Sequence, residues 1–274
     1  RPFLPRETSI VSTIHNIVRR HIDFPYQNFL ERHIYRRSNV VVACSATVAD
    51  SLKEKGRALS PVRIIVNGIP DDRIGPRDAD LREETRRSLR ASPDDIVFLS
   101  AGRLAEEKNI GYGLRVINSL RKMIPGVSYG IAGTGPREEG LRQLTGELDL
   151  EKHVAFLGYR TDIPKLMNAA DVFLMPSICE GLPLALIEAL GSRLLCVATP
   201  FDSACEVIED DQTGVIIPFD DAEAAVEKLA LFLRQPDRVK EITEAAHEYA
   251  RRHFTASRMT REYEELYEEI CSRR

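Results

Sequence analysis

Residues 176–191 read PSICEGLPLALIEALG, and the fold and function predicted from the sequence depend chiefly on this segment. The apolar run Asp171–Met175 before it is typical of a buried strand, and Pro183 suits the first residue of a helix. Every side chain from Leu184 to Leu190 except Glu188 is aliphatic, so this helix should be buried on all sides. A strand therefore passes into a buried helix through a short loop.

Two glutamates of this stretch predict a site for a nucleotide diphosphate. An unpaired carboxylate inside an apolar helix would cancel most of the free energy of unfolding of a typical domain. Glu188 should therefore face a polar cavity or a polar partner. Glu180 lies on the loop, beside backbone N–H groups that would form an anion site at the helix start. The residues of this expected anion site at the helix start are Gly181, Leu182, Pro183 and Leu184. Alternatively, Glu180 caps the helix and Glu188 pairs with a core Arg or Lys.

The form E-G-L-P-L-A-L-I-E-A, with seven residues between Glu180 and Glu188, resembles the signature of retaining GT-B glycosyltransferases of family four, the glycosyl transferases group 1. In that family the second glutamate binds the ribose of a nucleotide sugar, and the first lies by the donor sugar. The resemblance implies an α/β fold of GT-B type, with two Rossmann-like doubly wound parallel-sheet domains. It also implies retaining transfer of a hexose-type sugar from a nucleotide-diphosphate sugar to a glycan or lipid-linked glycan.

Alternating strand and helix patterns suggest how the chain is divided. Residues 1–70 have a βαβαβ order and are predicted to be the latter part of the N-terminal, acceptor-side domain. We expect a linker at 71–80, the nucleotide-sugar-binding domain at 81–252, and a C-terminal helix at 253–274 that crosses back to the first domain. Three strands leave an open sheet, so the first domain should be incomplete. The remaining strands would precede Arg1 in a longer protein or come from another chain.

Two cations are expected beside the central helix. Gly102 and Arg103 follow the predicted strand Ile96–Ala101, and Lys108 comes shortly after them. Ligands of open parallel sheets lie beyond the carboxyl ends of strands, so both side chains should reach the same crevice. They can hold a diphosphate leaving group, at about 1.5–3 kcal/mol for each charge-assisted bond. G-R-L followed by E-K-N resembles the family, which uses the matching Arg and Lys in this way; a surface ion-pair loop is the alternative.

Two glycine-containing segments resemble other parts of the donor site. Gly133 and Gly135 belong to a G-T-G-P turn, which in the family brings the backbone close to the donor nucleotide. A plain tight turn would explain them equally well. Gly158, Tyr159 and Arg160 resemble the segment that approaches the nucleobase, or they form the rim of the pocket.

His15 follows the predicted strand Ser9–Ile14 and matches a family histidine near the donor sugar, where it would act as a general acid or base. A structural histidine is the alternative. The pair Asn67-Gly68 suits a turn with positive φ. Where the family commonly has Gly-Gly before Pro-Glu, this chain has non-glycine residues before Glu206, so the choice of sugar stays open.

Composition limits the class of protein. The chain has 274 residues, of which 43% are hydrophobic and 29% charged, as in globular proteins. Its five cysteines are scattered without C-x-x-C spacing, which argues against a disulfide framework and a structural zinc site. No secretory signal is evident, so a cytoplasmic location is expected. We expect no metal and no cofactor besides the donor, because cationic side chains and a helix end take the metal's place.

The charge is uneven along the chain. Residues 1–70 carry eleven Lys or Arg and five Asp or Glu, a net charge of +6, and the rest of the chain carries −10. The basic residues could meet an anionic acceptor or a membrane surface, giving a peripheral membrane contact, or they form a solvated helix face. They are Arg19, Arg20, Arg32, Arg36 and Arg37. Nucleic acid is not expected, because aromatic residues do not alternate with them.

Other functions are compatible with these patterns. The chain could be a nucleotide-binding fragment without turnover of its own, or a nucleotide-sugar epimerase of the same architecture. A phosphorylase of this architecture would need a pyridoxal lysine, and no motif indicates one.

Overall fold

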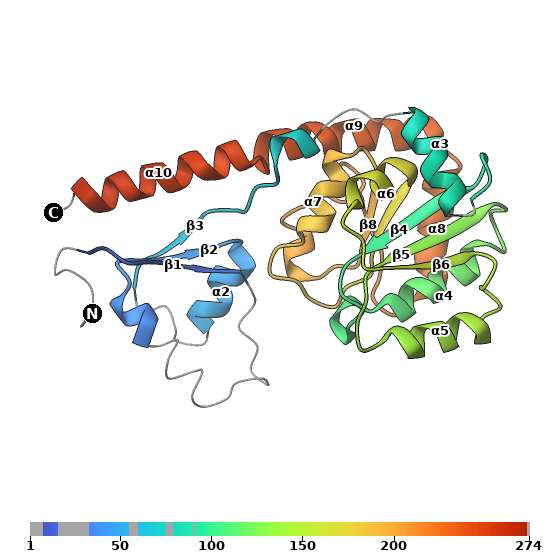
Figure 1. Cartoon of the computed structure of the whole chain (residues 1–274), viewed down its shortest axis with the longest axis horizontal. Coiled ribbons are helices and arrows are strands. Elements are labelled where there is room, and N and C mark those ends of the chain that lie inside the picture. Colours follow the sequence, from blue (N-terminus) through green and yellow to red (C-terminus); the bar gives the residue numbers. More distant parts are fainter. Residues whose placement is uncertain (1–7, 16–32, 55–59, 75–78, 90, 273–274) are drawn as a thin grey trace.

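The computed structural model describes residues 8–15, 33–54, 60–74, 79–89 and 91–272. Two parallel sheets with flanking helices lie side by side, and the last helix extends from one to the other (Figure 1). The apolar pattern of the sequence also predicts a helix at Pro25–Tyr35. Most of that segment lies outside the described residues, as do Arg19, Arg20 and Arg32, and residues 33–37 are helical.

The first sheet has three parallel strands in the order β1-β2-β3. These are β1 (Val11–Ile14), β2 (Val40–Ala43) and β3 (Val62–Ile64). Helix α2 (Ala46–Glu54) covers one face, where Val48 and Leu52 are completely buried. β-Branched residues dominate β2, whose side chains point alternately to the two faces, so Val41 and Ala43 contact α2 while Val42 faces the other side.

The second sheet has six parallel strands in the order β6-β5-β4-β7-β8-β9. This is the doubly wound order in which the chain reverses its direction of travel between β4 and β7, so a crevice opens beyond the carboxyl ends of those two strands. The strands are β4 (Ile96–Ala101), β5 (Val127–Ala132), β6 (Val154–Gly158), β7 (Val172–Met175), β8 (Leu195–Ala198) and β9 (Val215–Ile216).

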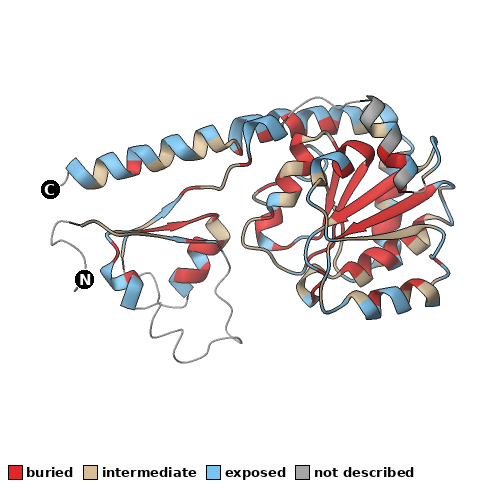
Figure 2. Cartoon of the chain, in the orientation of Figure 1, coloured by how far each residue is buried: buried red, intermediate tan, exposed pale blue. Residues whose placement is uncertain are grey.

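Helices cover both faces of this sheet, as its almost continuous burial requires (Figure 2). One core contains side chains of α6, α7 and α9, and the other contains side chains of α4, α5 and α8. The helices are α3 (Ala79–Ser88), α4 (Ile110–Leu120), α5 (Glu138–Glu147), α6 (Ile163–Ala169), α7 (Leu184–Gly191), α8 (Ala222–Leu233) and α9 (Pro236–His253).

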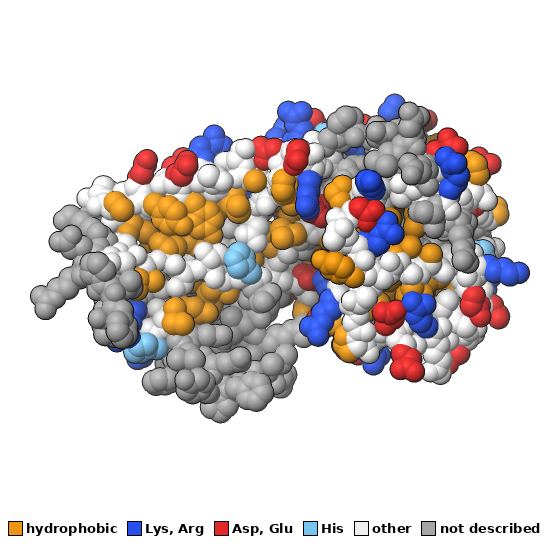
Figure 3. Space-filling view, viewed as in Figure 1, with side chains coloured by type: hydrophobic (Ala, Val, Ile, Leu, Met, Phe, Trp, Pro, Cys, Tyr) orange, Lys and Arg blue, Asp and Glu red, His pale blue; other side chains and the backbone are white. Residues whose placement is uncertain are grey.

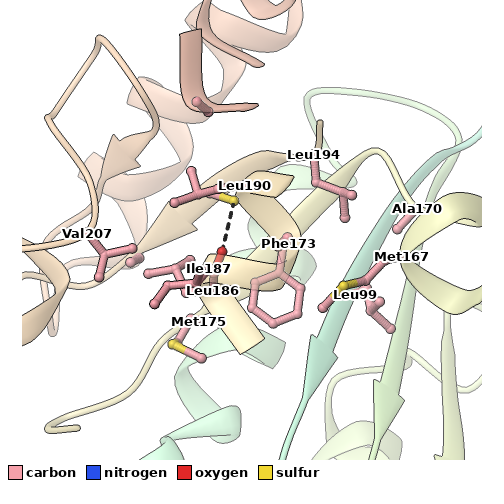
Figure 4. Close-up of a cluster of buried hydrophobic side chains, with 14 of the residues drawn as sticks. Leu99, Met167, Ala170, Phe173, Met175, Leu186, Ile187, Leu190, Leu194 and Val207 are labelled. Atoms are coloured by element: carbon pink, nitrogen blue, oxygen red, sulfur yellow. Dashed lines mark hydrogen bonds between the residues drawn. The ribbon is translucent and has the colours of Figure 1, made fainter. Parts of the chain in front are cut away.

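Helix α7 packs on the middle of the sheet. Its side chains Leu186, Ile187 and Leu190 are completely buried and lie by Phe173 and Met175 of β7 (Figure 4). The sequence predicted burial on all sides, which is wrong for the first residue, since Leu184 is 41% exposed. Pro183 precedes the helix as its N-cap instead of beginning it. The first turn extends beyond the packed core, and there Ala185 lines a pocket.

Helix α10 (Ala256–Ser272) leaves the second domain and lies along the free face of the first sheet (Figure 1). Its buried Leu266 packs with Val42 and Ile65, and the hydroxyl of Tyr263 lies 3.2 Å from that of Thr13. Apolar side chains gather beneath this helix (Figure 3). The C-terminal helix therefore supplies part of the first domain's core.

Two chain segments run side by side where the domains join. Ile69 and Thr255 form a parallel bridge, and a Cβ on Gly68 would lie 2.2 Å from the carbonyl oxygen of Thr255. Glycine is therefore required at position 68 by this close approach. The positive φ expected for the Asn67-Gly68 turn is wrong, because Gly68 is not among the described residues with positive φ.

Candidate functional site

The loops after β4 and β7 meet at the crevice beyond the sheet. Gly102 directly follows β4 with φ of 151°, and the side chain of Lys108 passes over it, with Cε 3.5 Å from where a Cβ would be. A glycine is needed there for the backbone conformation. Lys108 ends a short 3₁₀ turn, η2 (Glu106–Lys108), which directs it back toward the β7 loop.

Lys108 and Glu180 form an ion pair across these loops. Nζ of Lys108 donates to Oε1 of Glu180 at 2.6 Å, and the Ser177 hydroxyl donates to the same oxygen at 2.8 Å. The side chains are 22% and 14% exposed. Glu180 therefore does not cap α7, and the structure brings the two predicted residues together as one unit.

A pocket of about 580 Å³ opens beside this pair. Its walls come from the ends of β4 and β5, from the loops that follow β4, β5 and β6, and from residues of α6 and α7. Among the predicted residues, the pocket is lined by Arg103, Gly133, Gly135, Tyr159, Arg160 and Glu188. Lys108 lines a small adjoining cavity that shares Gly102 and Arg103 with the pocket. The two predicted cations therefore border the same region.

Glu188 lines this pocket and also has a basic partner. An oxygen of its carboxylate accepts a hydrogen bond from Arg73, which belongs to the turn η1 (Asp71–Arg73) between the domains. Both predicted surroundings, a cavity and a basic residue, are present. The partner is not a core residue, however, since the side chain of Arg73 is 44% exposed and that of Glu188 only 16%.

The predicted anion site at the start of α7 is smaller than the sequence suggested. Pro183 has no N–H, and the N–H of Leu184 donates to the carbonyl of Leu182 at 3.0 Å. The hydrogen bonds of the described residues include none from the N–H groups of Gly181 and Leu182. These two groups are the donors that remain of the predicted segment.

The glycine turn after β5 packs against the loop after β4. A Cβ on Gly133 would lie 1.8 Å from the carbonyl oxygen of Gly102, and one on Gly135 would lie 2.3 Å from that of Leu104. Gly133 also donates to the carbonyl of Gly158 at 2.7 Å. This segment is therefore a tight turn, as one of the two interpretations expected. It also brings three strand ends together in one wall of the pocket.

Tyr159 and Arg160 form the rim of the pocket. Tyr159 is 77% exposed. Arg160 makes two hydrogen bonds to Asp162, each of 2.7 Å, and these raise the pKa of Arg160 and lower the pKa of Asp162. Its guanidinium is thus already engaged by a carboxylate.

His15 lies at the carboxyl end of β1, exposed, and does not line the pocket. Its Nδ1 is 3.2 Å from the side-chain nitrogen of Asn67. Because that amide nitrogen donates, Nδ1 accepts, and a neutral ring carries its proton on Nε2. The structure leaves His15 separate from Arg103, Lys108 and Glu188.

Sequence reasoning missed Arg73 and Ser177 as partners of the two glutamates. Arg73 is separated from Glu188 by more than a hundred residues, and no periodicity connects them. Ser177 could have been noticed, because its hydroxyl lies in the same loop as Glu180. A group of His, Cys, Asp or Glu side chains arranged for a metal is not found among the described residues.

Two family profiles match the chain. Residues 81–252 match the family described as "Glycosyl transferases group 1", and residues 3–73 match "Glycosyltransferase Family 4". The chain is 28% identical over 248 residues to a putative colanic acid biosynthesis glycosyltransferase, WcaL, of Salmonella typhimurium, covering 87% of this chain and 59% of WcaL. It thus spans about three fifths of that curated relative.

Two further proteins are similar in sequence or structure. A UDP-Gal:alpha-D-GlcNAc-diphosphoundecaprenol alpha-1,3-galactosyltransferase of Escherichia coli is 28% identical over 173 residues, covering 61% of this chain and 44% of the relative. Anabaena Alr3699/HepE, solved in complex with UDP and glucose, has the same fold, with a TM-score of 0.86 at 20% identity over 95% of this chain and 71% of that one. The chain therefore has the GT-B fold and belongs to the glycosyl transferases group 1 family.

Proposed function

We propose that this protein transfers a hexose-type sugar from a nucleotide-diphosphate sugar to a glycan or lipid-linked glycan, with retention at the anomeric carbon. The observation that carries the proposal is the pocket that Arg103 and Glu188 line beside the Lys108–Glu180 pair. It offers cations for a diphosphate, a carboxylate for ribose hydroxyls, and a second carboxylate for the sugar.

The donor would lie with its diphosphate between the β4 loop and the start of α7. Arg103, Lys108 and the N–H groups of Gly181 and Leu182 would stabilise the charge that develops on the departing diphosphate. Glu188 would bind the ribose after exchanging part of its contact with Arg73 for the hydroxyls. Gly158, Tyr159 and Arg160 would lie by the base. The cations and N–H groups supply the electrostatic role of a metal, so we propose transfer without one.

The acceptor side belongs to the first domain. His15 would approach the donor sugar from the end of β1 and would exchange a proton through Nε2, since Asn67 holds Nδ1. The Escherichia coli relative's name includes a diphosphoundecaprenol-linked acceptor, which supports a lipid-linked acceptor here. Arg36 and Arg37 would then contact the anionic surface of a membrane from the cytoplasmic side, without nucleic acid as a partner.

None of the described helices is long and apolar enough to cross a membrane.

The test is a screen of nucleotide sugars with and without glycan and lipid-linked acceptors. Binding is measured by calorimetry, turnover by release of nucleoside diphosphate, and the configuration of the product by NMR. A retaining glycosyltransferase releases nucleoside diphosphate only with acceptor and gives a product of unchanged anomeric configuration. Binding without turnover would instead identify a nucleotide-binding fragment, and conversion of the donor without acceptor would identify an epimerase.

A further inference from the structure

A second set of contacts joins the two domains near the loop that carries Glu180. It centres on Glu206, which follows the turn η3 (Asp202–Ala204) of the second domain. Its carboxylate accepts from the N–H groups of Ala46 and Thr47, each at 2.7 Å, and from the Thr47 hydroxyl at 2.5 Å. These N–H groups begin α2 of the first domain and have no acceptor within the helix. One carboxylate therefore satisfies the start of a helix in the other domain.

Ser45, which precedes α2, extends this contact to the loop of Glu180. It is completely buried, its hydroxyl donates to the carbonyl of Gly181 at 2.7 Å, and its oxygen accepts from the N–H of Val48 at 3.1 Å. From the second domain, the hydroxyl of Ser203 donates to the carbonyl of Glu180 at 2.9 Å. Two consecutive carbonyls of the loop are thus each held by a serine, one from each domain.

Holding these carbonyls fixes the N–H groups of the same peptide units. In a trans peptide the C=O and N–H point in opposite directions. The carbonyl of Glu180 therefore orients the N–H of Gly181, and the carbonyl of Gly181 orients the N–H of Leu182. These are the two donors that remain at the start of α7. The side chain of Leu182 also packs against the core of the first domain around α2.

We propose that Ser45 and Glu206 are positioning residues, which couple the approach of the two domains to the orientation of the phosphate-binding N–H groups of Gly181 and Leu182. Glu206 holds the start of α2 in place, and Ser45 at that start holds the loop. When the domains separate, the carbonyl of Gly181 loses its donor, and the N–H of Leu182 loses its fixed direction. The proposal rests on the proposed function for its consequence in catalysis, whereas the contact between the domains is independent of it.

The variant Glu206→Gln tests the coupling with little change in shape. Glutamine has one carbonyl oxygen in place of two, so its NH₂ group would face the N–H of either Ala46 or Thr47. We expect a weakened contact, a Kd for UDP, ADP or GDP raised about tenfold, and a kcat/KM lowered by as much as roughly a hundredfold, as for a misplaced binding group. Ser45→Ala should do the same, and Ser45→Thr, which keeps the hydroxyl, should restore most of the wild-type behaviour.

The matched control is Glu209→Gln, the same substitution three residues further along. Glu209 is exposed and makes none of the hydrogen bonds between the domains described above, so Kd and kcat/KM should stay at wild-type values. Small-angle scattering gives a readout that needs no activity: the radius of gyration should rise in Glu206→Gln and Ser45→Ala but not in the control.

The outcomes separate this inference from the proposed function. Wild-type Kd, kcat/KM and radius of gyration in both Glu206→Gln and Ser45→Ala would overturn the coupling. If the wild type binds none of the three nucleotides, the proposed function fails and scattering alone decides: a larger radius in both variants supports the contact, and an unchanged radius overturns it. A larger radius with unchanged Kd and kcat/KM would also overturn the coupling, because the loop would then be organised without the first domain.

Discussion

Replacing Lys108 by alanine should lower turnover far more than it lowers the population of folded protein. The change removes the 2.6 Å bond to Glu180, while the Ser177 hydroxyl still donates to the same carboxylate. Loss of one charge-assisted hydrogen bond costs about 1.5–3 kcal/mol of stability. For a domain stable by about 5 kcal/mol, roughly 2 kcal/mol would remain, and only a few per cent of the molecules would unfold. A lost donor to the developing charge, by contrast, costs about a hundred- to a thousandfold in kcat.

A second lysine provides the control for this comparison. Lys228 is 27% exposed and pairs with two carboxylates, Asp210 at 2.8 Å and Asp211 at 2.9 Å, so it resembles Lys108 in burial and in being ion-paired, but it does not line the pocket. Lys228→Ala should therefore lower the midpoint of thermal unfolding by a similar amount while leaving kcat unchanged. Turnover is measured as release of nucleoside diphosphate at saturating donor and acceptor. Equal kcat for Lys108→Ala and the wild type, or an equal loss in Lys228→Ala, would refute the reasoning.

Three further changes test other parts of the structure. Gly68→Ala should lower stability by about 1–3 kcal/mol because of the close backbone contact, whereas Gly140→Ala, which meets nothing within 4 Å in a helix, should be neutral or stabilising in urea unfolding. Glu188→Ala should raise the calorimetric Kd for the bound nucleoside diphosphate about tenfold or more, and no change would exclude ribose binding. Hydrogen bonds from Ser257 lower the pKa of Asp71. The stability that they add is therefore present above the unfolded pKa of about 3.9 and is lost as the pH falls through the lower folded value. In Asp71→Asn the free energy of unfolding should depend less on pH in this acid range, and an unchanged pH dependence would contradict this.

The second domain was largely predictable from local patterns. Apolar runs such as Asp171–Met175 mark the strands of the six-stranded sheet, and glycines lie at the ends of three of them, β4, β5 and β6. The alternation with helices predicts the parallel arrangement. The family and the GT-B fold, expected from the spacing of Glu180 and Glu188 and from the segment around Arg103, are confirmed. Local pattern was sufficient here because each element follows from residues that are neighbours in sequence.

The partners of the site residues were not predictable in the same way. Arg73 of the turn between the domains pairs with Glu188 of the second domain, and Ser45 of the first domain bonds to Gly181 of the second. The spacing of apolar residues in either segment does not specify such a pair, because these contacts depend on how the domains dock. The need for glycine at position 68 has the same origin, since it comes from the backbone of Thr255 and not from the turn itself.

The bridge between Ile69 and Thr255 has a mechanical consequence for the motion of the two domains. The polypeptide passes from one domain to the other at that point and returns there, so two adjacent backbone segments connect the domains. A single strand would allow torsion about its own axis, whereas a paired one resists twisting and bends chiefly in one direction. When the domains move, they should accordingly follow the same arc each time, which brings His15 back to the same place relative to Lys108.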